Sequence, residues 1–327
     1  MPDPNLGQLA ASVWANVIGT KPSDQIRGSL ALLYLLGEKG FKEDCSGGAT
    51  ADFIIEYANN PSFVSVGEFE TLDTTRYDVF DTLQYAWKLN AGTVVYSELE
   101  KLRAAAASRK FDVLAEKMNN GKNSHLATMN VQFFGDGSGN AGKDFDGLTK
   151  LIPTDPTTGI VGGINRATFS WHRSQTTSGA KTTTIFDNLR SSMRSSYNKQ
   201  SRGGTLSQPT AWITSRTVFE GFEGTLVANE RYLMEAKSRG ADAGFDNDAL
   251  LFKGAKGLYD EDCSPATSLY MFSNEGLKLA YLAGGWMKMY PEISPSNQLT
   301  VVNKVATFAN LATPNSRRLG VVYNCTS

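Results

Sequence analysis

The longest period-two stretch of the sequence spans residues 77–89, and it constrains the fold most strongly. Its odd positions, including Val79, Leu83 and Tyr85, are mostly apolar, whereas its even positions are mostly polar. Alternate residues of a β-strand lie on the same face, so this pattern predicts a strand with one apolar and one polar face. The stretch is long compared with a typical strand of about 5–6 residues.

A second extended stretch, residues 62–72, precedes it, and residues 72–77 (LDTTRY) supply a polar turn. Two long strands joined by a polar tip predict a β-hairpin whose tip reaches beyond the body of the protein. Because an isolated two-stranded hairpin is only marginally stable in water, a projecting hairpin needs a neighbour on which to lie. The alternative is a hairpin that folds back on its own domain.

A long helix is predicted over residues 97–120. Ser97 followed by Glu100 fits a capping box, and Asn119-Asn120-Gly121 supplies a stop signal. Such a helix would be about 35 Å long. The residues predicted to form its packing face are Leu99, Leu102, Ala106, Phe111, Leu114 and Met118.

The remaining segments indicate an α+β fold. Helices are predicted from Ile26 to about Gly37 or Gly40 and over 49–58, 183–198 and 216–233. Strands are predicted over 129–134, 167–173, 210–215 and 298–323, the last split into two by Pro314. Residues 238–248 read as a mobile loop.

Composition limits the class of protein. The chain has 327 residues, 41% of them apolar, which is enough for two subdomains. A net charge of −1 argues against a protein that reads nucleic-acid sequence, since such proteins carry a basic excess. We expect no membrane span, no secretion signal and, with only three cysteines, no disulfide framework.

Residues 137–144 (GSGNAGKD) resemble a phosphate-binding loop, G-x-x-x-x-G-K-[ST]. Asp144 stands where a Mg²⁺-binding hydroxyl is required, and its carboxylate would repel phosphate oxygens. No apolar strand that ends in Asp follows to hold the metal. The pattern therefore argues against a nucleotide site, although a nucleotide-binding hydrolase remains the alternative from another functional class.

Catalytic and metal-binding patterns are otherwise missing from the sequence. The two histidines, His125 and His172, lie near no cysteine, and no G-x-S-x-G motif is present. His172 is interpreted as a strand residue that packs against a neighbour. We predict no enzyme activity, no cofactor and no metal, and instead a structural or interaction protein.

A strip of basic residues is predicted along one helix and its end. The residues are Arg190, Arg194, Lys199 and Arg202. A solvated helix face is the favoured interpretation, and a contact to an acidic neighbour or to DNA is the sharper alternative.

The order of segments resembles that of the major capsid proteins of tailed bacteriophages, which have the Hong Kong 97-like fold. Five stretches carry the resemblance. Residues 63–89 are similar to the extended loop (E-loop), and residues 97–120 are similar to the spine helix of the peripheral (P) domain. Residues 145–152 with 159–173 are similar to the passage after that helix, 208–226 to part of the axial (A) domain, and 250–273 followed by 319–323 to the late strands.

The resemblance implies a division of the chain. Residues 1–60 would form an N-terminal arm with leading helices, 61–92 the E-loop, 93–150 the P-domain with its spine helix, 151–296 mainly the A-domain, and 297–327 the closing P-domain strands. The connectivity between the two domains is left open.

The resemblance also implies assembly. Hexamers and pentamers of the chain would tile an icosahedral shell around packaged double-stranded DNA, which they contact non-specifically, in the virion of a short-tailed phage. Assembly would take place in the host bacterial cytoplasm. A portal would be a further partner, and a phage tail-tube or baseplate protein is the alternative. The E-loop residues expected at an intersubunit contact are Glu68, Glu70, Leu72, Asp73, Thr74, Thr75, Arg76, Tyr77, Val79 and Asp81.

The chain departs from that family in two respects. Family members whose shells are covalently cross-linked use a lysine of the E-loop for the cross-link. In this chain residues 61–87 contain no lysine, and Lys88 lies at the base of the hairpin. We therefore predict no cross-linking, and a cement protein as an additional partner. Residues 1–60 read as part of the fold, so a separate scaffolding protein is expected.

Overall fold

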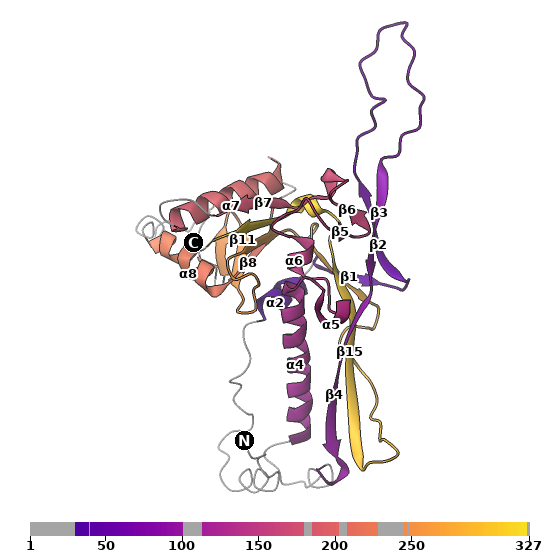
Figure 1. The fold of residues 1–327 in the computed structure, drawn as a ribbon, viewed down its shortest axis with the longest axis vertical. Coiled ribbons are helices and arrows are strands. Elements are labelled where there is room, and N and C mark those ends of the chain that lie inside the picture. The colour runs from indigo at the N-terminus through magenta and orange to yellow at the C-terminus, as the bar shows by residue number, and fades with distance from the viewer. Residues whose placement is uncertain are drawn as a thin grey trace.

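The structure is a computed structural model that describes residues 30–38, 40–100, 113–179, 185–202, 208–227, 245–246 and 249–325. Two main sheets form an elongated body, and a hairpin projects beyond them (Figure 1). Most strand pairs are antiparallel, and the helices occur in separate segments of the chain, which confirms the α+β class.

The five-stranded sheet contains β1 (Lys42–Cys45), β13 (Lys278–Leu282), β15 (Thr300–Ala312), β14 (Lys288–Met289) and β4 (Lys88–Ser97). Its longest ladder joins β15 to β4, with Thr300 opposite Ser97 at one end and Ala309 opposite Lys88 at the other. The strand predicted before Pro314 is thus confirmed as β15.

The long helix α4 (Val113–Phe134) lies beside β4 and β15 (Figure 1). The predicted stop at residues 119–121 and the predicted strand over 129–134 are both wrong, because the helix continues through them. Gly121 explains the first error: a Cβ there would lie 2.4 Å from Val94 Cγ2. The glycine allows close approach of helix and sheet and does not end the helix.

The seven-stranded sheet has the order β7 (Gln175–Ser178), β16 (Leu319–Tyr323), β12 (Leu269–Phe272), β8 (Ala211–Thr214), β11 (Ala255–Tyr259), β10 (Ala249–Phe252) and β9 (Phe245–Asp246). Helices α7 (Ile185–Ser201) and α8 (Arg216–Val227) pack on it. The predictions of β8, β16, α7 and α8 are confirmed within the described residues. The loop predicted over 238–248 lies mostly outside them.

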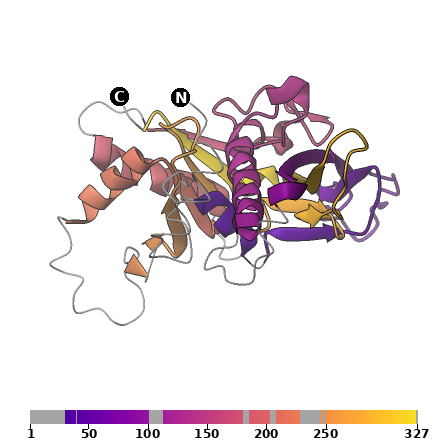
Figure 2. The same ribbon diagram turned by 90° about the horizontal axis from the view of Figure 1, so that it is seen from below.

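Both faces of the seven-stranded sheet are buried, and alternate residues reach different cores. Trp212, Met271 and Val322 pack with α7 and α8, whereas Ile213 and Tyr270 pack in the larger core. That larger core also holds residues of α4 and of the five-stranded sheet. Seen from below, α4 lies between the part of the chain that carries α7 and α8 and the part that carries the hairpin (Figure 2).

The shorter elements include α2 (Ala31–Gly37), which confirms the end of the first predicted helix, α5 (Gly139–Gly142), α6 (Leu148–Leu151), β5 (Ile160–Val161) and β6 (Ile164–Asn165). The segment 167–173 is not a strand; it holds the 3₁₀ turn η1 (Ser170–His172), which contacts the 3₁₀ turn η3 (Ser316–Arg318). None of the described helices is both long enough and apolar enough to cross a bilayer.

Candidate intersubunit surfaces

The projecting hairpin is built from β2 (Thr50–Glu56) and β3 (Phe80–Ala86), paired antiparallel with Thr50 opposite Ala86 and Glu56 opposite Phe80. The helix predicted over 49–58 is therefore wrong. Residues 62–72 were predicted as the partner strand, but they belong to the loop 57–79, which forms the tip (Figure 1). The alternation along β2, with Ala51 buried and Ile54 exposed, is typical of a strand and was overlooked.

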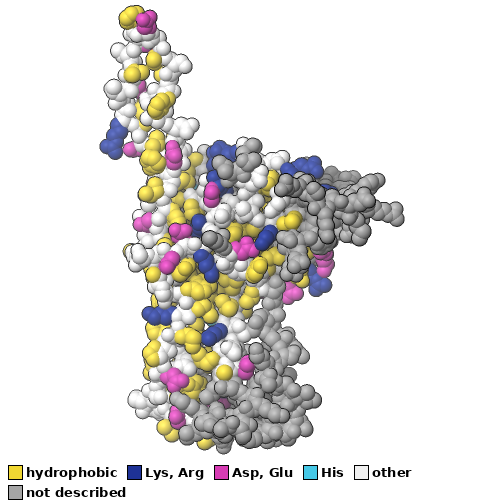
Figure 3. Space-filling view, turned by 180° about the vertical axis from the view of Figure 1, so that it is seen from behind, with side chains coloured by type: hydrophobic (Ala, Val, Ile, Leu, Met, Phe, Trp, Pro, Cys, Tyr) yellow, Lys and Arg dark blue, Asp and Glu magenta, His cyan; other side chains and the backbone are white. Residues whose placement is uncertain are grey.

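The loop 57–79 is almost entirely exposed, and apolar side chains lie along it (Figure 3). Phe63 is 87% exposed, Val64 64% and Phe69 94%. Isolated exposed apolar residues are ordinary, but several on one projecting loop indicate a contact surface. The sequence interpretation missed these three residues as site residues, although the apolar run of residues 63–69 carried the signal.

The ten predicted E-loop residues all lie on this loop or at the start of β3. Glu68, Glu70, Leu72, Asp73, Thr74, Thr75, Arg76 and Tyr77 are exposed, whereas Val79 and Asp81 are half-buried. The hairpin thus brings the predicted residues together on one projection.

Asp73 organises a turn within the loop, between residues 73 and 77. Its carboxylate accepts hydrogen bonds from the Thr75 amide at 2.9 Å, the Thr75 hydroxyl at 2.6 Å and the Tyr77 hydroxyl at 2.8 Å. These bonds, led by that of the Thr75 hydroxyl, lower the pKa of Asp73. The loop therefore has local structure although no strand crosses it.

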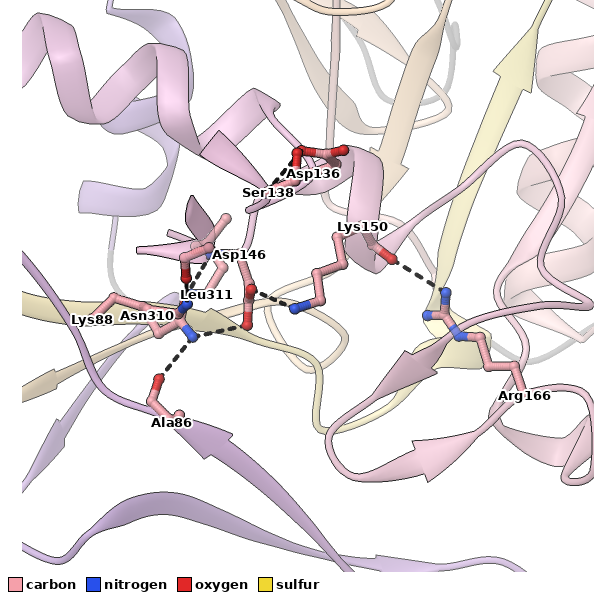
Figure 4. Close-up of polar contacts among 10 residues, drawn as sticks. Ala86, Lys88, Asp136, Ser138, Asp146, Lys150, Arg166, Asn310 and Leu311 are labelled. Carbon is pink, nitrogen blue, oxygen red and sulfur yellow. Dashed lines mark hydrogen bonds and ion pairs between the residues drawn. The ribbon is translucent and has the colours of Figure 1, made fainter. Parts of the chain in front are cut away.

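Asn310 of β15 joins the base of the hairpin to the body (Figure 4). Its amide Nδ2 donates to the Ala86 carbonyl at 2.9 Å and to the Asp146 carboxylate at 3.0 Å. Its Oδ1 accepts from the Asp146 amide at 2.9 Å and the Leu311 amide at 3.0 Å. Lys150 neutralises Asp146 at 2.6 Å. Because Asn310 is fully buried with its polar atoms paired, it ties the end of β3 and the Asp146 segment to β15.

Arg166 is a second buried polar residue near this base. It is 1% exposed, and its guanidinium donates to the Lys150 carbonyl (Figure 4). It also donates to the Leu151 carbonyl at 2.5 Å. These are carbonyls of the last turn of α6, which have no hydrogen-bond donor within the helix itself. Burial lowers the pKa of Arg166 to about 10, so it stays charged at neutral pH. The arginine is structural.

His172 is fully buried in η1, and its Nδ1 lies 3.2 Å from the Ser316 hydroxyl. Burial, followed by the charge of Arg166, lowers the pKa of His172 to about 4. The imidazole is therefore neutral at physiological pH. It packs against a neighbour, but in a 3₁₀ turn and not in a strand.

The spine-helix residues are only partly described. Ser97 and Glu100 form the predicted capping box, with Glu100 N to Ser97 Oγ at 3.1 Å and Ser97 N to Glu100 Oε2 at 3.2 Å. Leu102, Ala106 and Phe111 lie outside the described residues, as does the side chain of Leu114. Met118 is half-buried, and its sulfur accepts from Asn303 of β15 at 3.5 Å.

Leu99 was predicted on the packing face, but it is 57% exposed. It follows the end of β4, near a second apolar projection in which Leu299 is 86% exposed and Ile293 47%. Glu98 and Glu292 line the groove beside Leu299, whose volume is about 650 Å³. This end of the five-stranded sheet is a second candidate contact surface.

The loop 137–144 does not have the geometry of a phosphate-binding loop. It follows α4 and not a strand, and Asn140 and Ala141 have left-handed backbone angles. Asp144 accepts from Gln132 at 3.0 Å and Asn140 at 3.1 Å, so its carboxylate closes the loop. Lys88 donates to the Gly142 carbonyl and ties the loop to the base of the hairpin.

Comparisons with known proteins add to this geometry. No family model and no curated protein matches the sequence. The fold, however, is similar to solved shells over nearly the whole chain. The capsid protein of cyanophage A-1(L) has a TM-score of 0.68 at 14% identity, covering 98% of this chain and 99% of that one.

Two further structures show the same likeness. The encapsulin SrpI of Synechococcus elongatus has a TM-score of 0.62 at 11% identity, covering 98% of this chain and 96% of that one. The capsid protein of Myoviridae phage XM1 has a TM-score of 0.60 at 10% identity, covering 94% and 96%. The chain therefore has the Hong Kong 97-like fold of capsid and encapsulin shell proteins, as the sequence predicted.

Proposed function

We propose that this chain is the major capsid protein of a tailed bacteriophage, which assembles as hexamers and pentamers into an icosahedral shell around double-stranded DNA. The observation that carries the proposal is the match in both directions: almost all of this chain aligns with almost all of a capsid protein. No further domain is left over for another activity within the matched length. The protein acts by binding copies of itself and has no enzyme activity.

The projecting loop supplies the contact in this proposal. Phe63 and Phe69 are almost fully exposed in the single chain, and burying a Phe side chain stabilises by about 1.5–3 kcal/mol. Two such side chains would contribute about 3–6 kcal/mol to each loop contact. Contacts of this size, repeated around every subunit, act together because each linked contact raises the effective concentration at the next.

The division of the chain follows the two sheets. We assign residues 61–92 to the E-loop, with β2 as the second strand of its stem, and α4 with the five-stranded sheet to the P-domain. The seven-stranded sheet with α7 and α8 belongs to the A-domain. The closing segment 297–327 serves both domains, because β15 lies in one sheet and β16 in the other.

Non-covalent assembly completes the proposal. The loop 57–79 has no lysine, and Lys88 at its base is held on the Gly142 carbonyl. Particles boiled in denaturant should therefore release single subunits, and a ladder of linked subunits on a gel would contradict this. A scaffolding protein, a cement protein and a portal are further proposed partners. The fold does not select a short-tailed phage, since similar structures include Myoviridae phage XM1 and a GTA particle.

Electron microscopy of the purified protein tests the assembly directly. Closed shells are expected; rings or tubes would favour a tail part, and a small oligomer that hydrolyses nucleotide would favour the enzyme alternative. Shells purified from infected cells should contain DNA, whereas protein cargo alone would favour an encapsulin-like compartment.

The double variant Phe63→Ser/Phe69→Ser tests the loop. It should lose assembly and keep the unfolding midpoint of the single subunit, since both side chains are exposed. The matched control is Asn59→Ser, at an exposed position of the same loop outside the predicted contact residues, and it should assemble normally. If the double variant formed normal shells, the loop would not be part of the intersubunit contact.

A further inference from the structure

Helix α7 has one face in the core and one face in solvent. Leu189, Met193 and Tyr197 are buried against the seven-stranded sheet and α8. On the outer side, Arg194 and Arg202 are exposed and Arg190 is half-buried. Arg190 and Arg194 are four residues apart and are therefore neighbours on the helix surface, and Arg202 directly follows Ser201, the last residue of the helix. We call these three arginines, together with Arg317 below, the arginine stripe.

None of the arginines of the stripe forms an ion pair with a carboxylate among the side chains that the structure describes. Residues 185–202 contain three arginines and one lysine against a single acidic residue, Asp187, although the whole chain has a net charge of −1. Other arginines do have carboxylate partners: Arg216 pairs with Glu220 at 2.7 Å. Lys199 is engaged elsewhere, since it donates to the Thr176 carbonyl at 2.9 Å.

Arg317 extends the stripe from a different element. It is exposed on η3, the 3₁₀ turn that packs against α7. Burial, followed by the charge of Arg202, lowers the pKa of Arg317, so two guanidinium groups lie within electrostatic reach of each other. Like charges brought together from two segments repel, and a bound anion would relieve that repulsion.

Helix capping explains only one end of the stripe. A cation near a helix C-terminus interacts favourably with the dipole within the last turn, which accounts for Arg202. Arg190 and Arg194 lie too far from that end. Arg202 itself has φ +48°, a left-handed conformation that Gly or Asn adopts more easily.

We propose that Arg190, Arg194, Arg202 and Arg317 form a binding surface for the phosphate backbone of duplex DNA. This inference rests on the proposed function, because the shell supplies the DNA and α7 must then face its interior. From Arg190 to its end at Ser201, α7 rises by about 17 Å, enough to follow several successive phosphates. Arginine favours this role because its planar fork binds phosphate through two hydrogen bonds. The stripe reads no sequence, since phosphate contacts carry none.

The test measures binding of the full-length chain, before assembly, to a fluorescent duplex of about 20 base pairs between about 50 and 200 mM NaCl. The variant is Arg190→Gln/Arg194→Gln/Arg202→Asn/Arg317→Gln. Each phosphate contact contributes about 0.9 to the slope of log affinity against log salt, so the variant should lose about 3 to 4 units of slope. Arg190→Gln or Arg194→Gln alone should lose about 1 unit each, which keeps the test valid if the quadruple variant is unstable.

Arg216→Gln is the matched control, because Arg216 is an exposed arginine on the neighbouring helix α8 with a carboxylate partner. Its slope should equal that of the wild type. An unchanged slope in the stripe variants would overturn the inference. If the stripe variants keep the wild-type slope but no longer form shells, the inference is also overturned, and the stripe belongs to a contact between subunits. Failure of the wild-type chain to form shells would instead refute the proposed function, whatever the slope.

Discussion

Replacement of Asn310 by Ala should destabilise the subunit strongly, because it breaks the polar network at the base of the hairpin. The Asp146 amide would lose its acceptor at 2.9 Å and the Asp146 carboxylate a donor at 3.0 Å. A stranded buried amide costs about 1–3 kcal/mol, and a hydrogen bond to a charged group is worth about 1.5–3 kcal/mol. The free energy of unfolding should therefore fall by about 2.5–6 kcal/mol, against a typical total of about 5–15 kcal/mol.

Urea unfolding of the unassembled subunit measures this effect, and Asn303→Ala is its control. Asn303 is also a buried asparagine of β15, but among the described residues its side chain donates to the Met118 sulfur alone, at 3.5 Å. Sulfur is a weak acceptor, so the control should lose about 1 kcal/mol or less. If the two variants lost equal stability, the network at the hairpin base would contribute nothing specific, and the reasoning would fail.

Three other predictions follow from single sites. His172 has a pKa of about 4 in the folded chain and about 6.5 when unfolded, so its contribution to stability is present above about pH 6.5 and is lost as the pH falls through about 4. Between about pH 7 and pH 4, the free energy of unfolding measured by urea titration should therefore fall by about 3 kcal/mol less in His172→Gln than in the wild type. An equal fall in both proteins would contradict this. Gly257→Ala should destabilise by about 1–3 kcal/mol, because the new Cβ would meet the Trp212 ring at 1.9 Å, whereas Gly224→Ala in α8 has open space and should stabilise by about 1 kcal/mol. Lys143→Ala should assemble like the wild type, and neither protein should retain ATP in equilibrium dialysis; retention would revive the nucleotide-binding alternative.

The sequence predicted the projecting hairpin but paired its strands wrongly. The period of two was plain from residue 77 to residue 89, so β3 and the start of β4 were expected. Residues 62–72 looked equally extended, but in the structure they meet no partner strand in the described chain. β2 is the partner because it places Ala51 and Phe53 against Tyr85 and the core. Pairing over a long range depends on the core, which local patterns do not contain.

The long helix shows a second limit of sequence reasoning. Asn119-Asn120-Gly121 is a good local stop signal, yet α4 passes through it because its next turns gain tertiary partners. His125 lies 2.8 Å from the Thr307 hydroxyl, and Asn130 donates to the Asp260 carboxylate at 3.1 Å. Contacts from one helix to β15 and to the loop after β11 outweigh about 1 kcal/mol of unfavourable glycine propensity.

The path of the chain explains how a contact at the loop can stabilise a whole shell. One extended run, Phe80–Ser97, passes from the hairpin into the five-stranded sheet with a break only at Trp87. Its first part pairs with β2 and its second part with β15, over ten paired residues. Hydrogen bonds of an antiparallel ladder lie perpendicular to the strands, so a force along the hairpin is shared among them. In the proposed shell, a neighbour that holds the loop therefore transmits force to the five-stranded sheet through this continuous run, and the ten paired residues of β4 and β15 resist that force together.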